Sequence, residues 1–310
     1  IADSLFGIKY NLSNFDLNKY GFNHVTSEKT MGLYQNNNAS QLAILTDGIY
    51  NNIDFTVNTL DNQTSLLNTL SGLNLTYFKR APSQLFDKDA RFLNQRVAKN
   101  VSNSNKDFVT ITYQVIAPPH SQLYVSIPNI SWSDDNNHSL SITVNGVTKN
   151  QVTDNTFDFF DLGYFETESM VTIKLSFPGN KAISFDNPSF YALDTQNYQI
   201  AMDTINERDS KVTTSKNKVF VDYSSKTNAS LFFTIPYDKG WTATINHKKV
   251  KIQRAQKGFM KVDVPSGKGK VVLTFIPYGL KTGSLISLLA SIIFCCYAYF
   301  IRKTTIIQKS

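Results

Sequence analysis

Short runs in which apolar and polar residues alternate dominate the chain beyond residue 105. They are DFVTITYQV (107–115), QLYVSIP (122–128), SLSITVNG (139–146), FDFFDLG (157–163) and MVTIKLSF (170–177). A period of two is that of a strand with one buried face, and short strands separated by polar turns are typical of a sandwich or barrel. Asn145-Gly146 is the signature of a type I′ hairpin turn. We therefore predict a mainly β protein.

The same order of runs recurs further along the chain, at offsets between 100 and 108 residues. The matched pairs are LYVSIPNISW (123–132) with LFFTIPYDKGW (231–241), SITVNGVTKN (141–150) with TATINHKKVK (242–251), FDFFDLG (157–163) with FMKVDVPSG (259–267), and VTIKLSFPG (171–179) with VVLTFIPYG (271–279). An ordered match over four segments indicates an internal repeat. It predicts two tandem, jelly-roll-like β-sandwich units, each burying one face of each of its sheets.

The flanking segments are less regular. LFGIKYNL (5–12) and TMGLYQN (30–36) predict strands, and NQTSLLNTLSG (62–72) predicts a helix that ends at its glycine. Between the copies, residues 195–211 show a loosely amphipathic helical pattern. We expect a mixed α+β region over 1–105 docked on the first sandwich, a first β-sandwich over 106–194, a helical connector over 195–211, a second β-sandwich over 212–280, a transmembrane helix over 283–301 and a basic tail over 302–310.

The segment GSLISLLASIIFCCYAYFI (283–301) is 19 residues long and carries no charge. At about 1.5 Å per residue it reaches roughly 28 Å as a helix, close to the ~30 Å hydrocarbon core of a bilayer. Arg302 and Lys303 follow directly, and Tyr297 and Tyr299 lie where interfacial anchors are found. A buried core helix would need other helices around it, and few are predicted. The segment therefore predicts a membrane span.

Charge is unevenly distributed around this span. From Pro236 to Lys281 there are ten Lys or Arg residues against two Asp residues, a net charge of +8, whereas residues 1–235 carry −4 and the tail +3. Such a basic unit beside a membrane suits attraction to anionic lipid or to an anionic polymer, and a solvated lysine-rich sheet face is the alternative. Positive charges flank both ends of the span equally, so the positive-inside rule alone does not orient it.

Known catalytic and metal motifs are absent from the sequence. Cys295 and Cys296 are adjacent and lie in the apolar segment, so neither a structural disulfide nor a zinc site is expected. No phosphate loop, nucleophile elbow or paired Cys-x-x-Cys occurs, and nothing resembles a nucleic-acid reader. The acidic run 134–137 lacks the spacing of a calcium loop, which favours a turn. We predict no cofactor, no metal and no nucleic-acid partner.

One stretch, IPYDKGWTATIN (235–246), concentrates the residues that favour binding or catalysis. Its counterpart in the first copy, IPNISW (127–132), has the same Ile-Pro and Trp, which favours a structural role for Pro236, Gly240 and Trp241: Pro236 ends a strand, Gly240 permits a tight turn and Trp241 starts the next strand with its ring buried. The candidate contacts for a glycan or anionic polymer are Tyr237, Asp238, Lys239, Lys248, Lys249, Lys251 and Arg254.

From IPYDKGW through PYGLKTGSLIS the chain resembles the C-terminal end of the YfhO family of large bacterial multispanning membrane proteins. LFGIKYNL, GLYQNNNAS and NQTSLLNTLSG are similar to the segments that open the large extracellular domain of that family. The resemblance covers essentially all 310 residues. Two details depart from the family pattern: Asn246-His247 stands where an Asp-Gly type of turn is common, and the Leu-Pro that usually ends the YQNNNASQL element is absent.

The resemblance implies the extracytoplasmic C-terminal module of a polytopic, GT-C-like membrane glycosyltransferase of Gram-positive bacteria. Members of the family resemble membrane glycosyltransferases that use polyprenyl-phosphate-linked sugars to decorate cell-surface polymers such as lipoteichoic acid. It implies folded domains outside the cell membrane, a cytoplasmic tail, and catalytic residues in membrane segments outside this sequence. A membrane-tethered glycan-binding or adhesin module without catalysis is the alternative, and a purely structural cap on the membrane part is a third hypothesis.

Overall fold

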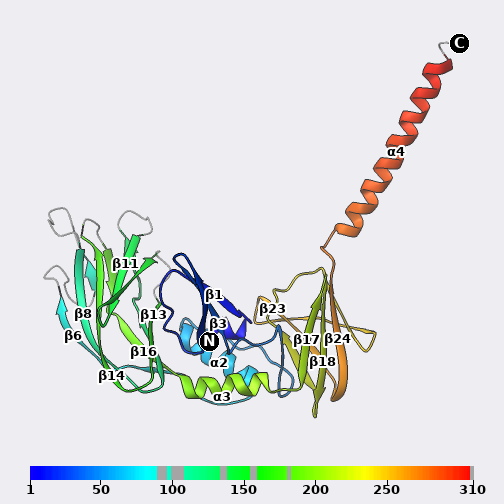
Figure 1. Ribbon diagram of the computed structural model, residues 1–310. Helices are drawn as coiled ribbons and strands as arrows, with labels where there is room; N and C mark the ends of the chain where they lie inside the picture. The colour runs from blue at the N-terminus through cyan, green and yellow to red at the C-terminus, as the bar shows by residue number, and fades with distance from the viewer. Residues whose placement is uncertain (89–95, 99–107, 133–137, 154–158, 180–182, 308–310) are drawn as a thin grey trace. The chain divides into compact units, whose positions relative to one another are not determined.

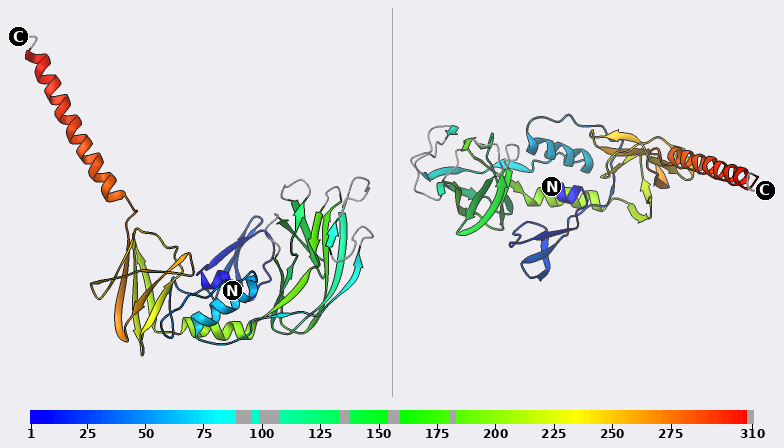
Figure 2. Two further views of the ribbon diagram at one scale, coloured as in Figure 1. Left: turned by 180° about the vertical axis from the view of Figure 1, so that it is seen from behind. Right: turned by 90° about the horizontal axis from the view of Figure 1, so that it is seen from above.

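The computed structural model describes residues 1–88, 96–98, 108–132, 138–153, 159–179 and 183–307. It is mainly β, as predicted, and divides into two compact units (Figures 1 and 2). The first unit comprises residues 1–41 and 53–208, and the second comprises residues 42–52 and 209–310.

The first unit is built around a β-sandwich. One sheet has five strands in the order β12 (Val147–Thr153), β11 (His138–Val144), β14 (Ser169–Pro178), β8 (Phe108–Ala117) and β6 (Ser83–Lys88). The facing sheet has four strands in the order β13 (Phe159–Phe165), β9 (Ser121–Ser126), β16 (Ser189–Asp194) and β5 (Phe78–Arg80). A small third sheet joins β10 (Ser131–Trp132), β15 (Ile183–Asp186) and β7 (Arg96–Ala98).

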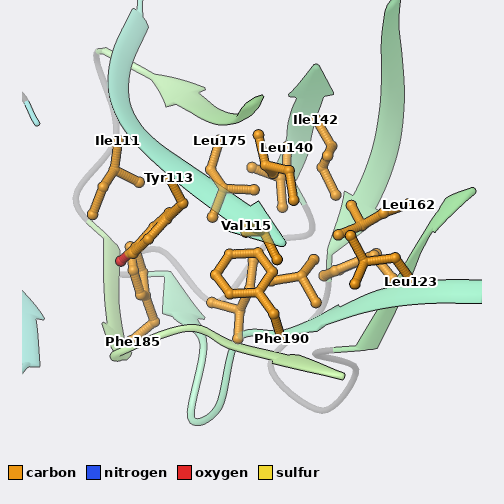
Figure 3. Packing of buried hydrophobic residues seen from close by; sticks show 14 of the residues in the cluster. Ile111, Tyr113, Val115, Leu123, Leu140, Ile142, Leu162, Leu175, Phe185 and Phe190 are labelled. Atoms are coloured by element: carbon orange, nitrogen blue, oxygen red, sulfur yellow. The ribbon is translucent and has the colours of Figure 1, made fainter. Parts of the chain in front are cut away.

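The core of this sandwich is the product of the alternation in the sequence. Along β8, Val109, Ile111 and Val115 are buried while the threonines between them are half-buried. Figure 3 shows such side chains meeting Leu123 of β9 and Phe190 of β16 from the other sheet. Burying apolar side chains from two sheets against each other is the main stabilising contribution in a fold of this kind.

Further elements of the first unit come from the N-terminal region and the connector. They are α1 (Ala2–Leu5), a sheet in the order β1 (Tyr10–Ser13), β3 (Met31–Asn36) and β2 (Phe22–Glu28), α2 (Thr59–Ser71) and α3 (Thr195–Asn206). The strand predicted over 5–12 is wrong in its first half, because Leu5 ends α1 and the chain then turns at Gly7, whose φ is +68°. The glycine stop of α2 is confirmed, since Gly72 adopts a left-handed conformation and its N–H caps the helix.

The second unit is likewise a sandwich of a five-stranded and a four-stranded sheet. Its five-stranded sheet runs β21 (Lys248–Val250), β20 (Trp241–Ile245), β24 (Gly267–Phe275), β18 (Lys218–Ser225) and β17 (Ser210–Ser215). Its four-stranded sheet runs β22 (Gln253–Ala255), β23 (Phe259–Val264), β19 (Ala229–Phe233) and β4 (Ala43–Leu45). The five-stranded sheets therefore have matching strand orders. In the four-stranded sheets the pair β23–β19 matches the pair β13–β9, but β22 lies outside β23 whereas β13 is an edge strand.

The last position of the second four-stranded sheet departs from a simple tandem repeat. In the first unit β16 pairs with β9, whereas in the second unit β4 pairs with the corresponding strand β19, through Leu45 and Leu231 among others. Residues 42–52 thus leave the expected region 1–105 and complete the second sandwich. The connector also ends earlier than expected, because β17 begins at Ser210.

A long helix, α4 (Leu280–Ile307), follows β24 at the C-terminal end of the second unit. Its segment Leu280–Tyr299 is long and apolar enough to cross a membrane, and none of it is buried against the rest of the structure. An apolar helix without protein neighbours exposes its side chains unfavourably to water, and this free-energy cost is removed when lipid surrounds the helix. The segment predicted over 283–301 lies within this helix.

Candidate functional site

The candidate stretch around Gly240 forms a tight turn between β19 and β20. Asp238 organises this turn, because its carboxylate Oδ1 accepts a hydrogen bond from the backbone N–H of Gly240 at 2.6 Å, and its carbonyl accepts one from Trp241 at 3.2 Å. This is an Asx turn, in which an aspartate side chain takes the place of a backbone acceptor. The carboxylate of Asp238 therefore serves the turn itself.

The same turn holds the chain that leaves β24. The backbone N–H of Ile276 donates to the carbonyl of Gly240 at 3.0 Å. A Cβ on Gly240 would lie well inside 3.0 Å from the Ile276 carbonyl oxygen, and 2.9 Å from the Phe275 ring. Gly240 is required for this close approach of two backbones, and not for a left-handed conformation. The turn thus fixes the segment that connects the sandwich to α4.

Two cation–aromatic contacts occur at the same end of the unit. The guanidinium carbon of Arg254 lies 4.6 Å from the centre of the Tyr237 ring, and Lys239 Nζ lies 5.7 Å from the centre of the Tyr278 ring. Tyr237 is half-buried and packs against the core of the second unit. Such contacts contribute about 0.5–1 kcal/mol at exposed sites. They link β22, the turn and the segment before α4.

Trp241 starts β20 as expected, but its ring is only half-buried and lies 4.9 Å from the Phe275 ring. Trp132, its counterpart in the repeat, is 1% exposed and donates its indole N–H to Thr153 Oγ1 at 2.8 Å. Trp132 lies in β10, whereas Trp241 lies in β20. The two tryptophans therefore have different environments, and the prediction that the Trp241 ring is buried is wrong, since that ring is only partly covered.

The remaining candidate residues lie along two edge strands. Lys248 and Lys249 belong to β21 at the edge of one sheet, Arg254 belongs to β22 at the edge of the other, and Lys251 lies between them. All four are exposed, and within the described residues no ion pair joins the three lysines to a carboxylate. Lysines on edge strands also prevent edge-to-edge aggregation, which is the structural alternative to a binding role.

The hairpin that presents these lysines is the same in both copies. Asn246 donates its backbone N–H to Lys270 O at 2.9 Å, and its side-chain oxygen accepts from Lys270 N at 2.9 Å. Asn145 makes the same pair of bonds with Thr172 in the first copy. Asn246 and His247 both have positive φ, of 46° and 69°, as a type I′ turn requires. The departure from Asp-Gly therefore leaves the turn type unchanged.

A buried polar cluster that the sequence did not reveal lies on the face of β23 that points away from the sandwich core. Lys261 is 8% exposed, and its ammonium donates to Tyr50 O at 2.8 Å and to Asp263 Oδ1 at 3.0 Å. Burial disfavours the charge on Asp263, but the hydrogen bonds from Ser230, Lys261 and Gln253 and the charge of Lys261 outweigh it and lower the pKa of this carboxyl. The cluster fastens residues 42–52 to the sheet.

A second buried carboxyl lies in the first unit. Asp161 Oδ1 accepts from Gln122 Nε2 at 2.5 Å and from the Gly163 N–H at 2.8 Å, and burial raises the pKa of this group despite these bonds. Neither this cluster nor that of Lys261 had a sequence signal beyond polar residues at alternate strand positions.

Within the described residues no group of three or more His, Cys, Asp or Glu side chains could hold a metal ion. The acidic run 134–137 lies outside the described residues.

Comparison with known proteins agrees with the membrane helix. A profile of the family described as bacterial membrane protein YfhO matches residues 1–287. Uncharacterized protein YfhO of Bacillus subtilis (strain 168) is 26% identical over 141 residues, which are 43% of this chain and 16% of that protein. The chain thus spans a small part of the length of this relative.

Two solved structures are similar at low scores. A cycloisomaltooligosaccharide glucanotransferase from Paenibacillus sp. is 9% identical, with 73% of this chain and 52% of that chain covered and a TM-score of 0.25. The CBM22 tandem domain from Paenibacillus barcinonensis is 9% identical, with 66% of this chain and 91% of that chain covered and a TM-score of 0.23. These likenesses carry no functional argument.

Proposed function

Because the chain belongs to the YfhO family of bacterial membrane proteins, we propose that it is the extracytoplasmic C-terminal module of a polytopic membrane glycosyltransferase. In this proposal the enzyme uses a polyprenyl-phosphate sugar donor to decorate a cell-surface polymer such as lipoteichoic acid. The folded units lie outside the cell membrane, α4 is the last span, and the tail 302–310 is cytoplasmic. Catalytic residues belong to membrane segments that this chain does not contain.

The module's part in the reaction is to hold the acceptor polymer near the membrane. One observation supports this role best: Lys248, Lys249 and Lys251 follow the exposed edge of the second sandwich, and within the described residues no ion pair engages them. A row of cations along an edge attracts a polymer of repeating negative charge, and a flexible polymer can bring its charges next to each lysine in turn. Arg254 lies on the neighbouring edge strand and extends the row.

Binding of lipoteichoic acid by the chain 1–310 in detergent micelles tests this role. Replacing the three lysines with glutamine removes the three ion pairs that they would form with the polymer. Each such pair at an exposed site is worth up to about 1 kcal/mol, so we expect the affinity for the polymer to fall about tenfold or more. Arg254 is left in place because it packs on Tyr237. The matched control removes three exposed lysines elsewhere in the unit, Lys211, Lys226 and Lys268. Equal losses in both variants would reject a specific polymer surface.

The division of labour has its own test. The full-length protein should transfer sugar, and the chain 1–310 alone should not. Sugar transfer by the isolated chain would overturn this part of the proposal. If sugar decoration in cells is unchanged when the lysine row is neutralised at equal protein level, the module is a structural cap on the membrane part.

The second candidate function is a membrane-tethered glycan-binding or adhesin module without catalysis, which the long apolar α4 alone would equally support. The coding sequence upstream of Ile1 distinguishes the two. A series of hydrophobic spans supports the glycosyltransferase, and a signal peptide supports the adhesin.

A further inference from the structure

Three loops meet at the end of the second unit from which α4 departs, which we call the helix-proximal end: the hairpin 215–218, the turn 235–241 and the segment 275–279. Phe275 N–H donates to Asn217 O at 2.8 Å, and Asn217 Nδ2 donates to Phe275 O at 2.7 Å. Ile276 N–H donates to Gly240 O at 3.0 Å. The segment before α4 is thus bonded on both sides to loops of the sandwich.

These bonds limit how far the helix-proximal end can lie from the bilayer. Leu280 lies four positions after Ile276, so the two Cα atoms are at most about 14 Å apart, whatever direction the helix takes. If Leu280–Tyr299 fills the hydrocarbon core, Leu280 lies at its boundary. The headgroup layer is roughly 5–8 Å thick and the Debye length is ~8 Å at physiological salt. The three loops therefore lie within the range of headgroup charge.

The helix-proximal end is cationic. Lys216 and Lys218 flank the hairpin, Lys239 lies in the turn, and Lys281 lies in the first turn of α4; all four are exposed. The sequence from Ser210 to Ile301 contains only three acidic residues, and of these only Asp238 belongs to the three loops. Its Oδ1 already accepts a hydrogen bond from Gly240 N–H. The charge of this end is therefore almost entirely positive.

Aromatic rings occupy the same end. Tyr278 is 80% exposed two residues before α4, and Lys239 Nζ lies 5.7 Å from its ring centre. Trp241 is half-buried beside Phe275. Tyr and Trp rings at headgroup level, accompanied by Lys, are the usual anchors of a membrane interface.

We propose that the helix-proximal end of the second unit is a docking surface for anionic phospholipid headgroups. Lys216, Lys218 and Lys239 bind lipid phosphates, while Tyr278 and Trp241 enter the headgroup layer. The second sandwich is thereby held against the membrane in one orientation. This inference needs only that α4 spans a membrane, and it is independent of the proposed glycosyltransferase role.

The test uses the chain 1–310 inserted through α4 into vesicles that contain lipids brominated near the headgroup. Quenching of Trp241 reports its depth, Trp132 is too buried to respond, and Trp241→Phe assigns the signal. A flexible Gly-Ser insertion between Tyr278 and Gly279 removes the short tether, so that contact then depends on the surface alone. The vesicles are phosphatidylcholine, or phosphatidylcholine and phosphatidylglycerol in equal parts.

With the insertion in place, we expect quenching to persist in the vesicles that contain phosphatidylglycerol and to disappear in phosphatidylcholine. Replacing Lys216, Lys218 and Lys239 with glutamine should lower the ratio of docked to undocked molecules roughly a hundredfold, because each lysine near an anionic surface contributes about a factor of five. The control variant with Lys211, Lys226 and Lys268 replaced, at the other end of the unit, should stay docked. Loss of quenching in both kinds of vesicle after the insertion would overturn the proposal. So would quenching that persists when Lys216, Lys218 and Lys239 are replaced with glutamine.

Discussion

Replacing Gly240 with alanine places a methyl group where the carbonyl oxygen of Ile276 already lies. The oxygen is a backbone atom, and the Phe275 ring and the Asp238 carboxylate lie 2.9 and 3.0 Å from the new Cβ, so no flexible side chain alone can relieve the clash. The turn and the segment after β24 must move apart. That movement breaks the hydrogen bond from Ile276 N–H to Gly240 O.

Two contributions set the magnitude of this effect. A lost backbone hydrogen bond costs about 1 kcal/mol, and a backbone shift forced by overpacking costs about 1–3 kcal/mol. We therefore expect Gly240→Ala to lower the free energy of unfolding of the second unit by about 2–4 kcal/mol. The change in tryptophan emission during urea unfolding of the chain in detergent micelles measures it, since Trp241 is the next residue.

Gly258 provides the matched control for this substitution. A Cβ there meets no atom within 4 Å, and the residue lies in the same end of the unit, where its carbonyl accepts from the Tyr237 N–H. Gly258→Ala should leave the unfolding midpoint nearly unchanged. If Gly240→Ala unfolds at the same urea concentration as Gly258→Ala, the close approach of the two backbones is not a constraint and our interpretation of the turn is wrong.

Three further predictions follow from single contacts. Trp132→Phe should destabilise the first unit by about 1–3 kcal/mol in chemical unfolding, because Thr153 Oγ1 loses its buried donor. The second unit should lose stability as the pH falls below about 4, since the folded-state pKa of Asp263 is lower than its unfolded value, and Asp263→Asn should flatten this dependence in acid titrations followed by circular dichroism. Asn246→Ala should cost about 1–2 kcal/mol, and Asn246→Gly less, because glycine keeps the positive φ but not the bond to Lys270.

The repeat was predictable from sequence because it rests on periodicity. Alternating positions such as Val109 and Ile111, or Val219 and Val221, follow directly from the pleat of a strand with one buried face. The hairpin asparagines Asn145 and Asn246 carry the same local signal in both copies. Fold class and the tandem repeat of segments therefore came from short-range patterns.

The rest depends on contacts between residues distant in the chain. Strand β4 has only three residues, too few to show an alternation of apolar and polar positions, and only its pairing with β19 places it in the second sandwich. Lys261 would be assigned to the surface by its type, yet Tyr50, which lies 211 positions earlier, covers it. The role of Gly240 likewise depends on Ile276, which a local turn pattern does not include. Candidate residues could be found from sequence, but the neighbours that define their roles could not.

The place of β4 has a consequence for the kinetics of folding. Thr46 bonds to Ser230 across 184 positions, and closing a loop of that size in an unfolded chain costs roughly 4–5 kcal/mol of entropy. Folding of residues 53–208 first would shorten the effective loop, so the first unit acts as an intramolecular scaffold for the second. During synthesis β4 stays unpaired until β19, its partner in the sheet, emerges from the ribosome. We therefore expect refolding of the second unit to be slow and to depend on the first. In the first sandwich the corresponding pairing, between β9 and β16, joins residues that are closer along the chain, such as Ser126 and Ser189, and so closes a shorter loop.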